Sequence, residues 1–311
     1  MPKPESAAEL SCRVGDLDIA YETFGDPADP AVLLVMGLGM QMLGWHQDFC
    51  AEIAGRGFHV IRYDNRDVGR STRMRGRPPT RVQLVLRSKK AAGYTLDDMA
   101  ADGAGLLDAL GVERAHVVGA SMGGMIAQTL AARYPERVLS LVSIMSNTGA
   151  RFSGQPAPEM YKILLKPAPR DREGYLQRTM TVFEAIGSPG FERDLDDLRA
   201  VAERSFERGH DPAGAGRQLA AIIASGDRTP LLRRIRVPTL VIHGTADKLV
   251  RPSGGRATVK AIAGARLMMV EGMAHDLPRG AWPQIIEAIA ANAARAGAGP
   301  HASGTGAGVA A

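Results

Sequence analysis

Cysteine is scarce in this sequence: 311 residues contain two, Cys12 and Cys50. Two are too few for a disulfide framework or a cysteine metal cluster, so we expect reduced thiols in a cytoplasmic protein. No apolar run approaches the roughly 20 residues that a membrane-spanning helix needs. Residues 1–10 lack the apolar core and the cleavage site of a secretory signal. The net charge of +5 is too small to imply a nucleic-acid partner.

Short apolar runs alternate with helical patterns along most of the chain. Such runs are typical of strands that are buried on both faces, and they occur at 31–36, 58–63, 115–118, 138–144 and 238–243. Amphipathic segments that predict helices follow most of them. The segment 95–110 has a capping-box start, with Thr95 as the cap and Asp98 three residues later. This alternation predicts an α/β fold with a mostly parallel, doubly wound sheet.

The alternation stops between 147 and 229. Helical patterns without a convincing strand occur there at 158–166, 172–186, 194–208 and 212–225. A helical insertion after the sixth strand would lie over the carboxyl edge of the sheet, where open α/β folds bind ligands. We therefore predict a core at 10–146 and 230–295 with a helical cap at 147–229. An insertion that only packs against the core is the alternative. We expect 1–9 and 296–311 to be disordered tails.

Ser121 lies in the pentapeptide Gly119-Ala120-Ser121-Met122-Gly123, between a predicted strand and a helical pattern that begins at Met122. A turn this tight leaves no room for side chains at the flanking positions, which explains the two glycines. The pentapeptide alone is weak evidence, but this context is that of a nucleophile elbow, which holds a serine hydroxyl clear of the sheet. A serine in an ordinary turn is the alternative.

A serine hydroxyl needs a general base and an acid that orients this base. Among the seven histidines, His275 follows the last predicted strand, in a loop at the same sheet edge as Ser121. Asp247 follows the strand 238–243 and lies between the serine and the histidine, the chain order of elbow enzymes. Asp276 is too close to His275 to curl back onto its ring. We therefore predict a triad of Ser121, His275 and Asp247, with a surface-loop histidine and a turn aspartate as the alternatives.

An oxyanion hole needs two amide donors. One is the residue after the nucleophile, Met122, and the other should come from the loop after the strand 31–36, where Leu38 stands between two glycines. Methionines adapt to varied apolar shapes, so we also predict substrate contacts at the edge of the sheet. Filling of gaps in a large core explains the methionines equally well. The predicted substrate contacts are Met36, Trp45, Met125 and Met145. This chemistry requires no metal and no organic cofactor.

Several stretches of the chain are similar to the actinobacterial α/β-hydrolase esterases. They are Leu33 to Gly39 with Leu43-Gly44-Trp45, His59 to Thr72, His116 to Gly123, and Gly272 to His275. That group includes anthracycline methylesterases and mycobacterial esterase/lipase-like proteins. The resemblance covers about residues 14–294, is weak through the cap, and implies the same triad. Many α/β-hydrolases carry His-Gly where this chain has Met36-Gly37, and the methylesterases are similar to this chain in having methionine.

Together these patterns predict a serine hydrolase that cleaves a carboxylic ester or thioester of a small to medium apolar substrate through an acyl-enzyme. An acyltransferase or a cofactor-free perhydrolase would use the same triad. A receptor on this fold would instead bind a small molecule and turn it over slowly. The patterns do not distinguish between these activities by themselves, and they leave the oligomeric state open.

The segment 66–90 is rich in arginine and lysine around the apolar stretch 82–86. A solvated loop with a short helix is the interpretation that we favour. The other is weak peripheral contact with an anionic membrane. A cytoplasmic protein is therefore expected, with membrane association left open by this segment.

Overall fold

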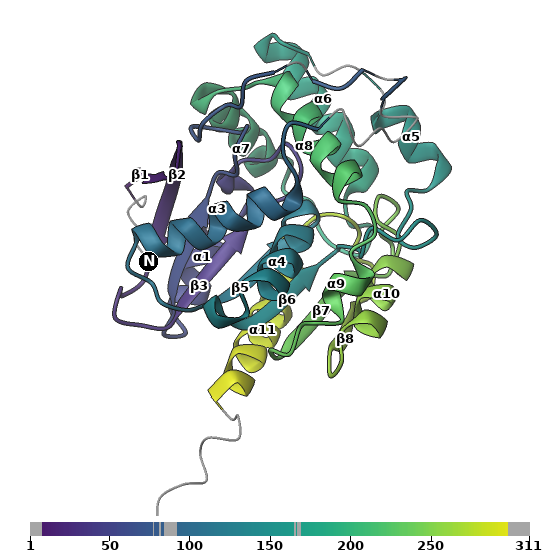
Figure 1. The fold of residues 1–311 in the computed structure, drawn as a ribbon. Helices are drawn as coiled ribbons and strands as arrows, with labels where there is room; N and C mark the ends of the chain where they lie inside the picture. Colours follow the sequence, from purple (N-terminus) through teal and green to yellow (C-terminus); the bar gives the residue numbers. More distant parts are fainter. Residues whose placement is uncertain are drawn as a thin grey trace, which may run out of the picture.

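Eight strands form one sheet, which runs through the centre of the molecule (Figure 1). The computed structural model describes residues 8–76, 78–80, 82–83, 92–164, 166 and 169–297. The strands are β1 (Leu10–Val14), β2 (Leu17–Phe24), β3 (Ala31–Val35), β4 (His59–Tyr63), β5 (Ala115–Ala120), β6 (Val138–Ile144), β7 (Thr239–Gly244) and β8 (Arg266–Val270). Their order in the sheet is β1-β2-β4-β3-β5-β6-β7-β8.

The six strands from β4 to β8 are all parallel, whereas β2 pairs antiparallel with β1 and with β4. The predicted mostly parallel α/β sheet is therefore confirmed. Because parallel strands end at the same edge, the loops after β3, β5, β7 and β8 meet at the carboxyl edge of the sheet. These are the loops for which the sequence predicts catalytic groups.

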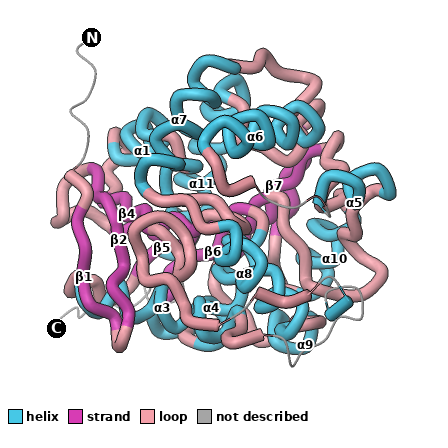
Figure 2. The backbone as a smooth tube through the Cα atoms, turned by 90° about the horizontal axis from the view of Figure 1, so that it is seen from above, coloured by secondary structure: helices cyan, strands magenta, loops and turns pink. Residues whose placement is uncertain are grey.

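Helices cover both faces of the sheet (Figure 2). The core helices are α1 (Gln47–Ala54), α3 (Leu96–Ala109), α4 (Met122–Arg133), α10 (Ser253–Ala261) and α11 (Trp282–Gly297), with short 3₁₀ helices at Met42–Gly44, Pro135–Arg137 and Arg279–Ala281. Alternate residues of β3 point to opposite layers: Leu33 and Val35 pack with α3 and α4, whereas Val32 and Leu34 pack with α1 and α11. A strand buried on both faces needs the continuous apolar run that the sequence has at 31–36.

The beginning of α3 and the end of α11 can be compared with the expectations from the sequence. Thr95 accepts from the amide of Asp98, and the Asp98 carboxylate accepts from the amide of Thr95, so α3 begins with the predicted capping box. At the other end of the chain, α11 continues to Gly297, two residues into the segment that we expected to be a tail. Residues 298–311 and 1–7 lie outside the described residues.

Helices and no strand occupy the described residues between β6 and β7. They are α5 (Pro158–Leu164), α6 (Arg172–Ile186), α7 (Leu195–Arg208), α8 (Pro212–Ser225) and the short α9 (Thr229–Leu232). Figure 1 shows α5 to α8 gathered beyond one end of the sheet. This is the helical insertion after the sixth strand that the sequence predicts, and we call residues 147–229 the cap.

Two ion pairs to buried carboxylates join the cap to the core. Arg208 of α7 lies 2.8 Å from a carboxylate oxygen of Asp64, and Arg217 of α8 lies 2.6 Å from one of Asp67. Both aspartates are fully buried, so each carboxylate depends on its arginine and on backbone amides to offset the loss of hydration. These contacts hold the cap against the loop after β4.

The basic segment 66–90 is described only in part, and residues 84–90 lie outside the described residues. In the described part, Arg66 forms a bidentate pair with Asp102, and Arg70 pairs with Glu9. Part of the positive charge is therefore neutralised within the protein. No helix in the described part of the chain is long and apolar enough to cross a membrane. Weak contact of this segment with a membrane stays a prediction.

His116 on β5 should make the folded state sensitive to mild acid. Burial, and to a smaller extent Arg114, lowers the pKa of His116 to about 4 from 6.5. The unfolded chain therefore binds the proton first, and stability that is complete above pH 6.5 is lost as the pH falls towards 4, by roughly 3 kcal/mol. The free energy of unfolding, measured with urea, should fall less between pH 7.5 and pH 4.5 for His116→Gln than for the unchanged protein. An equal difference in both would contradict this assignment.

Candidate active site

Ser121 occupies a strained turn between β5 and α4. Its φ is +56°, a left-handed backbone conformation that residues other than glycine rarely adopt. The turn is also too tight for flanking side chains, because a Cβ on Gly119 would lie 2.1 Å from the carbonyl oxygen of Gly123. A Cβ on Gly123 would lie 2.0 Å from the carbonyl oxygen of Val35. Both glycines are therefore required by close backbone contacts, and the turn directs the Ser121 side chain out of the sheet edge.

Three side chains from separate loops form a continuous hydrogen-bonded chain. Oγ of Ser121 lies 2.9 Å from Nε2 of His275, and Nδ1 of His275 lies 2.7 Å from Oδ2 of Asp247. A carboxylate can only accept, so Nδ1 carries the hydrogen and Nε2 of the neutral ring is the acceptor for the serine hydroxyl. The structure thus brings together the three residues that the sequence singled out, in an arrangement that can move the serine proton onto the ring.

Asp247 is held as a carboxylate. Burial by itself would raise its pKa, but the neighbouring His275 and hydrogen bonds from His243, His275 and the Val250 amide lower the pKa to about 2. The amides of Leu249 and Val250 both donate to Oδ1, at 2.9 and 2.8 Å, which leaves Oδ2 for the imidazole. At neutral pH the group is therefore a negative charge that can orient an imidazole and stabilise its protonated form.

His243 is a second histidine beside Asp247, and the sequence analysis did not assign it a role. It is fully buried at the end of β7, with Nε2 2.7 Å from the carbonyl oxygen of Val250 and 3.5 Å from Oδ2 of Asp247. The carbonyl contact makes Nε2 a donor. Its place at the carboxyl end of a strand, four residues before Asp247, was the signal that could have found it.

Two backbone amides are candidates for stabilising an oxyanion. Met122 begins α4, so its amide has no acceptor within the helix. The loop after β3 passes beside the nucleophile, because a Cβ on Gly37 would lie 3.2 Å from Cβ of Ser121. In that loop the Gly39 amide donates to the side chain of Gln218 at 2.8 Å and is therefore occupied. The Leu38 amide has no partner among the described residues, and its role as an oxyanion donor stays a prediction.

The four predicted substrate contacts are buried. Met36, Trp45 and Met145 belong to the apolar cluster on the α1 and α11 face, and Met125 belongs to the cluster on the α3 and α4 face. Trp45 has no exposed surface and stacks on Phe49 with 5.6 Å between ring centroids. Their contact with substrate stays a prediction.

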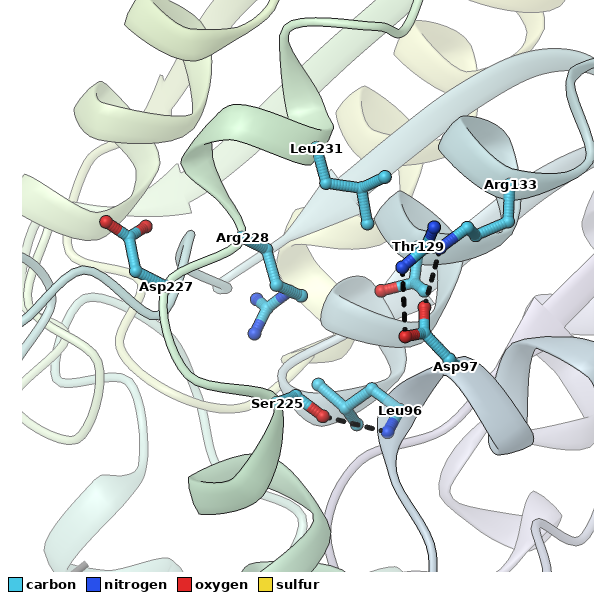
Figure 3. Close-up of a pocket in the computed structure, with 8 residues that line it drawn as sticks. All are labelled: Leu96, Asp97, Thr129, Arg133, Ser225, Asp227, Arg228 and Leu231. Atoms are coloured by element: carbon cyan, nitrogen blue, oxygen red, sulfur yellow. Dashed lines mark hydrogen bonds and ion pairs between the residues drawn. The ribbon is translucent and has the colours of Figure 1, made fainter. Parts of the chain in front are cut away.

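A cavity of about 120 Å³ has none of these four residues in its lining (Figure 3). Its lining comes from α3, α4, α8 and α9 and includes the ion pair between Asp97 and Arg133. Ser121, His275 and Asp247 do not line it. We therefore do not take it as the substrate site. In the described part of the chain, no group of three or more His, Cys, Asp or Glu side chains is arranged to hold a metal ion.

Comparison with known families agrees with the fold. A family model described as the alpha/beta hydrolase fold matches residues 30–278. The chain therefore belongs to the α/β-hydrolase family, as the resemblance noted from the sequence implies.

Among individual proteins, the chain is similar to two methylesterases. It is 31% identical over 293 residues to the rhodomycin D methylesterase DauP of Streptomyces sp. (strain C5), and 30% identical over 297 residues to the rhodomycin D methylesterase DnrP of Streptomyces peucetius. Each match covers 87% of this chain and 93% of the relative. The crystal structure of the enol-lactonase from Burkholderia xenovorans LB400 has a TM-score of 0.72 at 24% identity, covering 91% of this chain and 99% of that one. This last match shows the shared fold.

Proposed function

We propose that the protein hydrolyses carboxylic esters through an acyl-enzyme formed on Ser121. That it is a carboxylic ester hydrolase follows from the family match and from the methylesterase relatives. The hydrogen-bonded chain from Asp247 through His275 to Ser121 carries the mechanistic part of the proposal. No other group is needed to activate the hydroxyl, because the base already lies at hydrogen-bond distance from it.

In the acylation step, Nε2 of His275 takes the proton of Ser121 as Oγ attacks the ester carbonyl carbon. The amides of Leu38 and Met122 donate to the resulting oxyanion, and each such donor typically contributes about 3 kcal/mol to transition-state stabilisation. The C–O bond to the alcohol then breaks, and the alcohol leaves with the proton from His275. Asp247 stays ionised throughout and stabilises the imidazolium.

In the deacylation step, a water molecule takes the place of the departed alcohol. His275 removes a proton from this water, which attacks the acyl carbonyl carbon and forms a second oxyanion at the same amides. The C–O bond to Oγ breaks, Ser121 regains its proton from His275, and the carboxylic acid leaves. One base therefore serves both steps.

The substrate that we propose is a small to medium apolar ester, with methyl esters as the first class to test because the relatives are methylesterases. The buried methionines at the edge of the sheet, Met36, Met125 and Met145, would form adaptable apolar walls beside the nucleophile. A thioester meets the same chemical requirements, so both belong in one substrate panel.

The test is a panel of p-nitrophenyl esters, methyl esters and thioesters, combined with a fluorophosphonate that labels activated serines. We expect ester turnover, and we expect mass spectrometry of peptides to place the label on Ser121. Labelling elsewhere, or no turnover of any ester, would contradict the proposal.

Product analysis in the same assay separates the other activities. Transfer of the acyl group to added alcohol in preference to water would identify an acyltransferase, and peroxide-dependent bromination of an indicator would identify a perhydrolase. A rise in melting temperature on addition of a small molecule, with negligible turnover, would identify a receptor.

A further inference from the structure

The turn between α6 and α7 of the cap is hydrogen-bonded to the loop that carries His275. The amide of His275 donates to the carbonyl oxygen of Ile186 at 2.9 Å, and the amide of Gly190 donates to the carbonyl oxygen of Gly272 at 3.0 Å. The turn belongs to the cap and the loop follows β8 of the core. A cap segment therefore contacts the main chain of the histidine itself.

Ser188 lies in the middle of this turn and bridges the two neighbours of His275. Its Oγ accepts a hydrogen bond from the amide of Ala274 at 2.8 Å and donates to Oδ1 of Asp276. Ser188 is fully buried and Ala274 is buried, so water does not readily replace the hydroxyl. Loss of one partner would leave a buried amide unsatisfied, which typically costs about 1–3 kcal/mol.

Core residues bond to the main chain of the same loop on either side of Ala274 and His275, at its beginning and, through the indole of Trp282, at Leu277. The amide of Gly272 donates to Oγ1 of Thr245 at 3.0 Å, and the carbonyl oxygen of Met273 accepts from the amide of Ala246 at 2.9 Å. These bonds tie the start of the loop to the segment that leads to Asp247. Among the described residues, the amide hydrogen bonds of Ala274 and His275 instead go to the cap, so the alignment of the imidazole depends on cap residues.

We propose that Ser188 is a positioning residue that holds the His275 main chain where Nε2 meets Ser121 and Nδ1 meets Asp247. This inference rests on the proposed role of His275 as the base. It also means that the α6–α7 turn forms a fixed part of the active site and stays in place when substrate enters. A displacement of about 1 Å in a catalytic group reduces the rate about 100-fold, so a small shift of this loop is sufficient to impair catalysis.

The experiment compares Ser188→Ala with Ser205→Ala in the full chain. Ser205 is a matched control, because it is a buried cap serine whose hydroxyl bonds to the carbonyl oxygen of Val201 and to Tyr175, neither of which belongs to the loop that carries His275. We expect Ser188→Ala to lower kcat by about 10- to 100-fold with KM changed less than about threefold, since the substitution removes none of the predicted substrate contacts. Ser205→Ala should keep both constants, and Ser188→Thr, which retains the hydroxyl, should recover most of kcat.

A spectroscopic readout separates positioning from a general loss of stability. The hydrogen on Nδ1 of His275 gives a downfield proton resonance when it is bonded to a carboxylate, and His275→Ala assigns this resonance by its loss. We expect the signal to shift or broaden in Ser188→Ala at temperatures where circular dichroism shows a folded protein. Unchanged kcat and an unchanged resonance in that variant would overturn the proposal.

Two further variants keep the test decisive. If Ser188→Ala does not fold, Ser188→Cys retains the approximate size with a much weaker hydrogen-bonding group, and it should show the same loss of kcat. Full activity of Ser188→Cys would then count against the proposal. Ser121→Ala, assayed in parallel, separates the hydrolase mechanism from the role of Ser188. An active Ser121→Ala refutes the mechanism. An inactive Ser121→Ala beside a fully active Ser188→Ala refutes only the role of Ser188.

Discussion

Replacement of Ser121 by alanine should reduce the kcat for ester hydrolysis by about 10⁶-fold, because removal of a triad nucleophile leaves only binding and the oxyanion donors. The acyl-enzyme cannot form without Oγ, and fluorophosphonate labelling should disappear with the activity. Stopped assays with long incubation on a p-nitrophenyl ester, against a buffer blank, measure the residual rate.

The fold should survive this substitution. Alanine keeps the strained φ of +56° that Ser121 already has, so we expect the melting temperature to change by no more than a few degrees. Ser146→Ala is a suitable control, since Ser146 is a buried serine after β6 whose Oγ has no hydrogen-bond partner among the described residues. That variant should keep its activity. Turnover of Ser121→Ala at a rate near that of the unchanged protein would refute the mechanism.

The nucleophile could be predicted because its signals are local. Gly119 is needed because of contacts within the turn itself, and Gly123 because of contacts with Val35 and Met36 at the end of β3, but both glycines stand two residues from Ser121 in the sequence. His275 and Asp247 could be placed by a rule of topology, since loops after parallel strands meet at one edge of the sheet. The same local logic predicted the capping box at Thr95, which the structure confirms.

The supporting contacts could not be predicted, because they join segments that are far apart in the sequence. Ser188 lies 86 residues before Ala274, and Gln218 lies 179 residues after Gly39. Neither residue stands in a recognisable motif, and helix patterns do not reveal how a cap is oriented on its core. His243 is an intermediate case: its position at the end of a strand was visible, but its contact with the Asp247 carboxylate depends on how the loop after β7 folds back.

The cap supports both loops that flank Ser121. Ser188 bonds to the histidine loop, and Gln218 of α8 bonds to the amide of Gly39 and to the carbonyl oxygen of Arg66. Gln218 thereby connects the loop after β3, which contains Leu38, to the loop after β4. The insertion that we expected to lie over the carboxyl edge of the sheet therefore also contacts the two loops on which the proposed chemistry depends.

Replacement of Asp247 by asparagine should lower kcat by about 10⁴-fold while the fold is retained. The asparagine Oδ1 can still accept from the amides of Leu249 and Val250, which places Nδ2 against the ring of His275. Nδ1 must then become the acceptor and Nε2 the donor, so the ring can no longer take the proton of Ser121. Asp276→Asn is the matched control, because it removes the adjacent carboxylate and keeps an acceptor for Ser188; it should retain most of the activity.

Asp247→Asn also tests a prediction about stability in acid that is independent of the kinetic one. The pKa of Asp247 is lowered to about 2 from 3.8, so its ionised form favours the folded state. This contribution, on the order of 2 kcal/mol, is complete above pH 3.8 and is lost as the pH falls towards 2. Asp247→Asn lacks this contribution, so the difference in free energy of unfolding between the variant and the unchanged protein should become smaller between pH 5 and pH 2, as measured by urea unfolding. A difference in the free energy of unfolding that stays constant with pH would show that the Asp247 carboxylate is not stabilised by its neighbours. In the kinetic test, a loss of kcat below tenfold in Asp247→Asn would show that Asp247 does not set the tautomer of His275.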